Sequence, residues 1–144
     1  MDEFLQIVCP DCDTPNRVIS NRLAESPRCG KCKHALFMGR PVELKHSNFQ
    51  KHTGNNQIPV LVEFWAPWCS YCQRMAPVFA QAAGRLEPRV RLATVNTQTE
   101  PVLAGQWNVS GVPTLVLFRN GKEVARQSGA MDLETLINWV KSRI

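Results

Sequence analysis

At residues 64–72 the chain reads Phe64-Trp65-Ala66-Pro67-Trp68-Cys69-Ser70-Tyr71-Cys72. Before this stretch, Ile58 to Trp65 form a near-continuous apolar run, which is typical of a strand buried on both faces of a sheet. After it, from Ser70 to Leu86, apolar residues recur at helical spacing. A buried strand followed directly by a helix, with two cysteines at the junction, predicts an α/β domain.

The segments that follow alternate in the same way. Residues 90–96 read as a second buried strand, and Thr99 is expected to cap a short helix that begins near Pro101. Asn120-Gly121 stands between two strand-like runs, which is a strong hairpin signal. Asp132 is expected to cap a last amphipathic helix. The predicted fold is therefore a central mixed sheet flanked by helices.

Composition narrows the class of protein. The 144 residues, 44% hydrophobic and 20% charged, suit one domain of about 100 residues plus something smaller. The net charge of +5 is spread along the chain without a basic run, so nucleic acid is not an expected partner. The longest uncharged stretch, Pro101 to Phe118, is interrupted by polar residues and does not predict a membrane span.

The N-terminal residues Met1 to Phe4 are acidic and have neither the basic start nor the apolar core of a signal peptide. A cytoplasmic location is therefore expected. In a reducing cytosol six cysteines do not form a disulfide framework, which leaves metal binding and redox chemistry as their functions.

Two of the three Cys-x-x-Cys pairs, which are Cys9/Cys12 and Cys29/Cys32, have the spacing of a zinc ribbon. Four thiolates would give one closed, structural zinc site that stabilises a segment with little core of its own. Gly30 suits a turn that needs a positive φ or close backbone approach. Free or disulfide-paired cysteines are the alternative, as is replacement of one thiolate by His34.

The third pair predicts redox chemistry. Cys69 stands at a helix start, where unpaired N–H groups and the helix dipole favour a thiolate. An exposed Cys69 would attack a partner's disulfide, and a shielded Cys72 would resolve the mixed disulfide.

Several motifs together resemble thioredoxin over residues 41–144. They are Glu63-Phe-Trp-Ala-Pro-Trp-Cys-x-x-Cys72, Val112-Pro113-Thr114, Phe118-Arg-Asn-Gly-Lys122 and Ser128-Gly129-Ala130. With the four-cysteine segment, the whole chain resembles the zinc-binding thioredoxin 2 type of the bacterial cytosol. The resemblance implies a zinc segment at residues 1–36, a linker at 37–41 and a thioredoxin domain at 42–144.

The resemblance also implies roles for single residues. Pro113 matches a cis-proline beside the active site, where the backbone of Val112 would pair with a bound peptide. Gly129 matches the glycine of the substrate groove, and Trp68 matches the aromatic residue that shields the nucleophile. Ser70 and Tyr71 stand between the two cysteines and are expected to contact substrate.

Glu63 departs from the family, which usually has Asp at this position. A carboxylate in an apolar strand is costly to bury, so its pKa should rise, and it could relay a proton for Cys72. The alternative is a Glu63 that reaches solvent or pairs with a base. The lysine that often accompanies this carboxylate is replaced by Thr94.

Ser70-Tyr71 is a second departure, because the usual dipeptide is Gly-Pro. Tyr71 can offer an N–H to the sulfur of Cys69, which would stabilise the thiolate and raise the reduction potential from about −270 mV toward about −200 mV. The alternative function is therefore an oxidant, a disulfide isomerase or a glutathione-linked enzyme.

The leading hypothesis is a monomeric reductase of protein disulfides, with electrons from a thioredoxin-reductase-type donor. A third hypothesis makes the zinc segment the functional part, as a module that binds protein or nucleic acid. His46 and His52 lie in a polar stretch and are expected at the surface.

Overall fold

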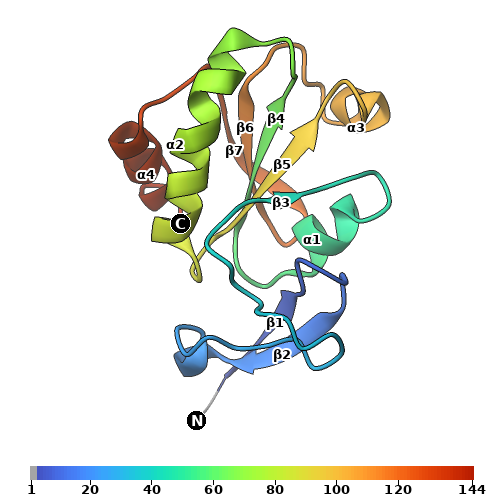
Figure 1. Ribbon diagram of the computed structural model, residues 1–144, viewed down its shortest axis with the longest axis vertical. Coiled ribbons are helices and arrows are strands. Elements are labelled where there is room, and N and C mark those ends of the chain that lie inside the picture. Colours follow the sequence, from blue (N-terminus) through green and yellow to red (C-terminus); the bar gives the residue numbers. More distant parts are fainter. Residues whose placement is uncertain (1–2) are drawn as a thin grey trace.

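A five-stranded sheet with helices on both faces forms the larger part of the protein, and a two-stranded hairpin unit lies at one end of it (Figure 1). The structure is a computed structural model that describes residues 3–144. Met1 and Asp2, which belong to the acidic N-terminus and to the predicted zinc segment, lie outside the described residues. None of the helices in residues 3–144 combines the length and apolarity needed to cross a membrane.

The strand order of the large sheet is β3-β5-β4-β6-β7. The first three strands in this order are parallel, β6 is antiparallel to β4, and β7 is antiparallel to β6. This confirms the predicted central mixed sheet. The strands are β3 (Val42–Glu43), β4 (Val60–Trp65), β5 (Arg91–Asn96), β6 (Thr114–Arg119) and β7 (Lys122–Ser128).

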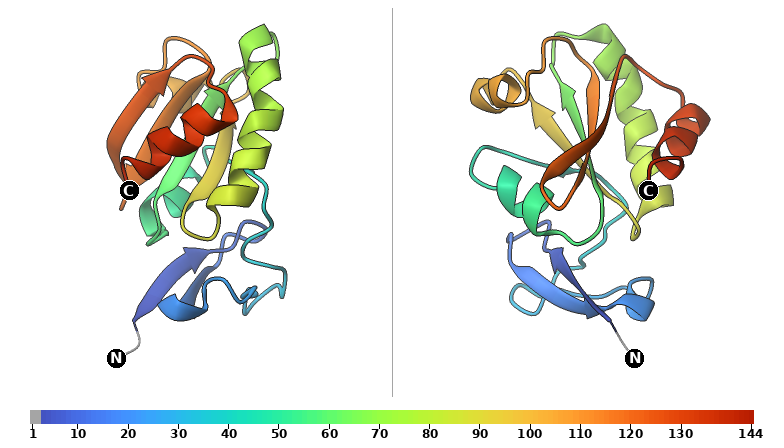
Figure 2. Two further views of the ribbon diagram at one scale, coloured as in Figure 1. Left: turned by 90° about the vertical axis from the view of Figure 1, so that its left-hand side faces the viewer. Right: turned by 180° about the vertical axis from the view of Figure 1, so that it is seen from behind.

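Helices cover both faces of this sheet (Figure 2). Helices α2 (Ser70–Leu86) and α4 (Leu133–Lys141) lie on one face, and α1 (Phe49–Asn55) and α3 (Pro101–Gln106) lie on the other. The carboxylate of Asp132 caps α4 by accepting the N–H of Thr135 at 2.8 Å, as predicted. Helix α1 was not predicted, since its sequence is polar and short.

The predicted cap of α3 is wrong by one residue. Glu100, and not Thr99, occupies the N-cap position, and the hydroxyl of Thr99 instead donates to the carbonyl oxygen of Asn96 at 3.3 Å. Pro101 opens the helix because the first helical residue needs no N–H partner.

Strand β4 is buried on both faces, which is why its sequence does not alternate. Val60, Val62 and Phe64 pack toward α1 and α3, whereas Leu61 packs toward α2 and α4. Glu63 is two residues from Leu61, so its side chain lies on the α2 face of the sheet.

The hairpin between β6 and β7 turns at Asn120 and Gly121, with φ values of 53° and 80°. Positive φ at both central residues matches the right-handed twist of the flanking strands and explains the Asn-Gly dipeptide.

The N-terminal unit is a hairpin of β1 (Phe4–Val8) and β2 (Pro15–Ile19), followed by a short 3-10 helix at Ser20–Arg22. Its apolar cluster is small, and one member comes from the larger domain. The buried members besides two cysteines are Ile7, Val18, Leu36 and Ile58.

Candidate functional site

Cys69 is the N-cap residue of α2, as its position at the strand-to-helix junction predicts. Its sulfur accepts the backbone N–H of Cys72 at 3.1 Å, and its thiol lies 3.6 Å from the carbonyl oxygen of Val112. The helix terminus therefore presents an N–H to the sulfur and favours its anionic form. Cys69 is only 5% exposed, so the expectation of an exposed nucleophile is wrong for this reduced, unbound form.

The N–H that reaches the Cys69 sulfur comes from Cys72 and not from Tyr71, which was the expected donor. Tyr71 instead extends outward, 59% exposed, with the guanidinium of Arg74 4.7 Å above its ring. Trp68 is 73% exposed. The two aromatic side chains thus form an exposed apolar rim around a nearly buried sulfur.

The peptide bond between Val112 and Pro113 is cis, as the resemblance implies. The carbonyl oxygen of Pro113 accepts the N–H of Gly129 at 2.9 Å, which joins the two loops beside Cys69. Gly129 has a φ of +96°, and a Cβ atom there would point into open space. Glycine is therefore explained by the backbone conformation, and the open space would admit a substrate chain.

Cys72 and Glu63 line one cavity of about 360 Å³ on the α2 face of the sheet. Cys72 is 3% exposed, and burial, assisted by the neighbouring Cys69 and the Glu63 charge, raises the pKa of its thiol to about 12. Such a thiol is a poor nucleophile until its proton is removed. Pro41, Trp65, Gln73, Ala76, Phe79 and Thr94 complete the lining.

Glu63 is 3% exposed, so the alternative in which it reaches solvent is wrong. Burial raises the pKa of its carboxyl from 4.5 to about 7, because desolvation disfavours the carboxylate. Thr94 lies beside it in the register of β4 and β5. Among the described residues, no group forms a hydrogen bond with the Oε2 atom of Glu63, and none forms an ion pair with Glu63.

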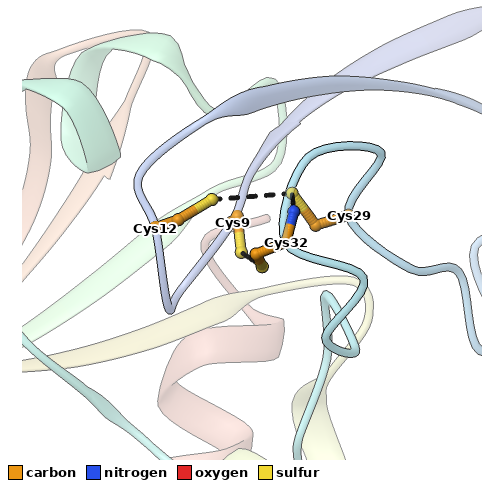
Figure 3. Close-up of side chains that lie close together, drawn as sticks. All are labelled: Cys9, Cys12, Cys29 and Cys32. Atoms are coloured by element: carbon orange, nitrogen blue, oxygen red, sulfur yellow. Dashed lines mark hydrogen bonds between the residues drawn. The ribbon is translucent and has the colours of Figure 1, made fainter.

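The other four cysteines converge at the end of the N-terminal hairpin (Figure 3). Their sulfurs lie within 4.8 Å of one another. The pairs Cys9/Cys32 and Cys12/Cys29 each have sulfurs 3.6 Å apart. A tetrahedral zinc with Zn–S bonds of 2.3 Å would place its sulfurs about 3.8 Å apart. The four residues therefore fit a zinc ion.

Both cysteine turns have the same backbone bonds. Asp13 donates its N–H to Cys9 and Lys33 donates to Cys29, each at 3.0 Å. The positive φ values lie at Asp13 (63°) and Lys33 (69°), just after each pair, and not at Gly30. The prediction for Gly30 is thus wrong: its N–H donates to the side chain of Asn16 at 2.8 Å without steric need for glycine.

The three histidines have different environments. His34 is 65% exposed and its Nδ1 lies 2.7 Å from a carboxylate oxygen of Asp11, although it is also close to Cys32. His46 is exposed, as expected. His52 was also expected at the surface, but it is fully buried and its Nε2 lies 2.8 Å from Asp13 Oδ1.

The contact of His52 with Asp13 joins α1 to the first cysteine turn. Burial lowers the pKa of His52, which favours the neutral ring as a hydrogen-bond donor to the carboxylate. Nearby, the N–H of Val8 donates to the side-chain oxygen of Asn56 at 2.7 Å. Sequence reasoning missed both contacts, because each joins residues at least 39 positions apart.

Comparison with known proteins agrees with this arrangement. Residues 40–142 match the family described as Thioredoxin, and residues 8–34 match the one described as Thioredoxin 2, N-terminal. Thioredoxin C-3 of Corynebacterium nephridii is 42% identical over 138 residues, which cover 96% of this chain and 94% of the relative.

Two further relatives cover the larger domain alone. Thioredoxin 1 of Nostoc sp. is 35% identical over 107 residues, which are 74% of this chain and 100% of the relative. Protein disulfide isomerase-like 1-4 of Arabidopsis thaliana is 44% identical over 104 residues, which cover 72% of this chain and 17% of the relative.

Proposed function

This chain belongs to the thioredoxin family and is a thiol–disulfide oxidoreductase with an N-terminal zinc ribbon, and we propose that Cys69, Cys72 and Glu63 carry its reaction. The observation that supports these roles is the position of the three groups. Cys69 caps a helix and receives an N–H bond, whereas Cys72 and Glu63 line one cavity and are both nearly buried.

In the first step, the Cys69 thiolate attacks one sulfur of a substrate disulfide. A bond forms between Cys69 and the substrate, and the second substrate sulfur leaves as a thiolate that takes up a proton. The approaching chain would pass Val112 and Gly129, where the open space at Gly129 leaves room for a strand-like contact. Trp68 and Tyr71, the exposed rim, would contact the substrate beside Ser70.

In the second step, Glu63 accepts the proton of the Cys72 thiol. The Cys72 thiolate then attacks the sulfur of Cys69, which forms the Cys69–Cys72 disulfide and releases, as a thiolate, the substrate sulfur that Cys69 had attacked. Two electrons have passed from the dithiol to the substrate. A reductase-type donor returns two electrons and restores both thiols.

We expect Glu63→Gln to slow the second step by about 10²-fold, the usual contribution of a positioned general base. The pKa of Glu63 is raised to about 7, so in the wild type the rate of this step should fall as the pH drops below 7. The measurement is the decay of a mixed disulfide between pH 5 and 9. A Glu63→Gln protein with an unchanged rate at pH 8 would contradict the role.

The same substitution should stabilise the fold at alkaline pH. The folded pKa of Glu63 is raised, so stability falls as the pH rises from about 4.5 to about 7 and is then constant. Over this pH range the free energy of unfolding should fall by about 3 kcal/mol. Glu63→Gln should remove this dependence in denaturant unfolding at pH 5 and pH 8.

Four cysteines, Cys9, Cys12, Cys29 and Cys32, would hold one zinc ion, which supplies a structural cross-link. The four-thiolate set has no open coordination position for a substrate. We place the zinc segment at residues 1–36, the linker at 37–41 and the redox domain at 42–144. We also propose a cytoplasmic location, because a reducing compartment keeps the four thiols available for zinc. A monomer is the expected oligomeric state.

The partners expected for this reaction are protein disulfides and a reductase-type donor, and we propose a thioredoxin-reductase-type protein rather than glutathione. The relatives do not favour the oxidant or isomerase alternative, although one of them is named an isomerase. The N–H that reaches the Cys69 sulfur is that of Cys72, whereas the expected rise in reduction potential was based on an N–H bond from Tyr71.

The experiment that tests the reductase function is equilibration of the zinc-loaded protein with defined thiol buffers. A Cys69/Cys72 potential near about −270 mV is expected of a reductase. A potential near about −200 mV or above would contradict it and support the isomerase or glutathione-linked alternative.

A further inference from the structure

The linker that leaves the zinc segment is held by two residues at the end of α2 and the start of β5. It passes from the hairpin unit to β3 along this edge of the larger domain (Figure 1). Arg91 donates to the carbonyl oxygen of Leu36 at 2.7 Å, and its guanidinium lies 4.8 Å from the centre of the Phe37 ring. Glu87 accepts the N–H of Gly39 at 3.0 Å.

Glu87 and Arg91 also form an ion pair at 2.7 Å, and their side chains are 4% and 1% exposed. Burying two charges costs free energy unless further hydrogen bonds satisfy them. Those bonds come from Leu36, from Gly39 of the linker and from the carbonyl oxygen of Val8, 3.2 Å from Arg91. Among the described residues, the Nε of Arg91 has no partner. Val8 directly precedes the cysteine Cys9. The pair therefore connects the cysteine turn and the linker to α2 and β5.

Two residues after Gly39, Pro41 lines the cavity that contains Glu63 and Cys72. The next residue, Val42, begins β3 and pairs with Ala93 of β5, so Pro41 is fixed on both sides. Proline has no N–H, and its ring adds apolar surface to the wall. An apolar wall that excludes water disfavours the charged form of a carboxyl group.

We propose that the Glu87–Arg91 pair is a positioning device that fixes the linker so that Pro41 closes one wall of the cavity in which Glu63 meets Cys72. The zinc segment is then coupled to the resolving cysteine through its last residue, Leu36, and the linker at 37–41. This inference rests on the proposed function, because the position of Pro41 matters for the reaction only if Glu63 accepts the proton of Cys72.

The surroundings of Glu63 make Pro41 a testable part of the wall. The neighbouring strand positions are Thr94 on β5 and Leu115 on β6, neither of which titrates. Of the described residues that line the cavity, Cys72 on α2 is the other titratable group, and it has a pKa of about 12. A change of the linker should therefore act on Glu63 through hydration.

The experiment follows the titration of Glu63 by carbon-13 NMR in the zinc-loaded, reduced full-length protein, with Glu63→Gln to assign the signal. Pro41→Gly should increase the hydration of the Glu63 carboxyl and lower its pKa by about one pH unit. Arg91→Lys, which keeps the charge but loses the fork of hydrogen bonds, should shift it in the same direction. Glu87→Gln replaces Arg91→Lys if that variant does not fold.

Matched controls are Pro101→Gly, an exposed proline at a helix start, and Arg85→Lys, whose partner Glu134 is exposed. Neither should move the titration. An unchanged Glu63 titration in Pro41→Gly overturns the inference. An unchanged titration in Arg91→Lys, or in Glu87→Gln where that variant replaces it, overturns the part assigned to Glu87 and Arg91. Failure of the proposed Glu63 role is distinguishable, because it would leave mixed-disulfide decay unaffected by Glu63→Gln.

Discussion

Cys69→Ser is expected to reduce protein-disulfide reduction to the uncatalysed level. A serine hydroxyl cannot replace the thiolate that attacks the substrate disulfide, even if the Cys72 N–H still donates to its oxygen as it does to the Cys69 sulfur. Turnover of a protein disulfide with an excess of dithiol or reductase measures the loss. Ser47→Ala is the control, since it alters an exposed serine outside the site and should keep the activity.

Cys72→Ser should give a different defect from Cys69→Ser. It leaves the attacking thiol in place and removes the resolving one, so a mixed disulfide with the substrate should accumulate and be visible by mass spectrometry. If Cys69→Ser, and not Cys72→Ser, trapped the substrate, the two proposed roles would be reversed.

Loss of one zinc-binding cysteine should unfold the N-terminal hairpin while the large sheet stays folded. Structural zinc sites contribute on the order of 10 kcal/mol of binding free energy, and the apolar cluster of this segment is too small to replace it. Cys29→Ser should therefore abolish zinc binding. Hydrogen exchange should become fast in β1 and β2 but stay slow in β4.

His34→Ala is the control for this experiment. His34 is exposed and lies against Asp11, and if the four sulfurs alone hold zinc, its loss should leave the zinc content unchanged. Slow exchange of β1 and β2 in zinc-free Cys29→Ser would contradict a structural role of the metal. Loss of zinc from His34→Ala would show instead that the histidine is a ligand.

Local sequence was enough to place the main elements of the larger domain. Helix α2 has the predicted bounds, Asp132 caps the last helix, and Asn120-Gly121 turns the hairpin. These features depend on residues close together in the chain: helical periodicity, capping side chains and the φ preferences of turn residues. The four-cysteine set was likewise recognisable from its spacing.

Burial and long-range pairing were less predictable. His52 lies in a polar stretch, yet it is buried because the cysteine turn folds over it and supplies Asp13 as a partner. Cys69 is less exposed than its position suggested, and the N–H bond to its sulfur comes from Cys72. The burial of His52 and Cys69 depends on residues distant in the chain, whereas the Cys72 N–H bond is a local helix cap.

The chemistry of this protein could be predicted from its residues alone, because the two kinds of cysteine pair differ in spacing and in what flanks them. How the parts cooperate depends on contacts between residues far apart in the chain. Burial raises the pKa of the Glu63 carboxyl to about 7, and the residues that surround it come from α2, β4, β5 and the linker. A buried ion pair such as Glu87 and Arg91 is stable only once distant carbonyl and N–H groups surround it.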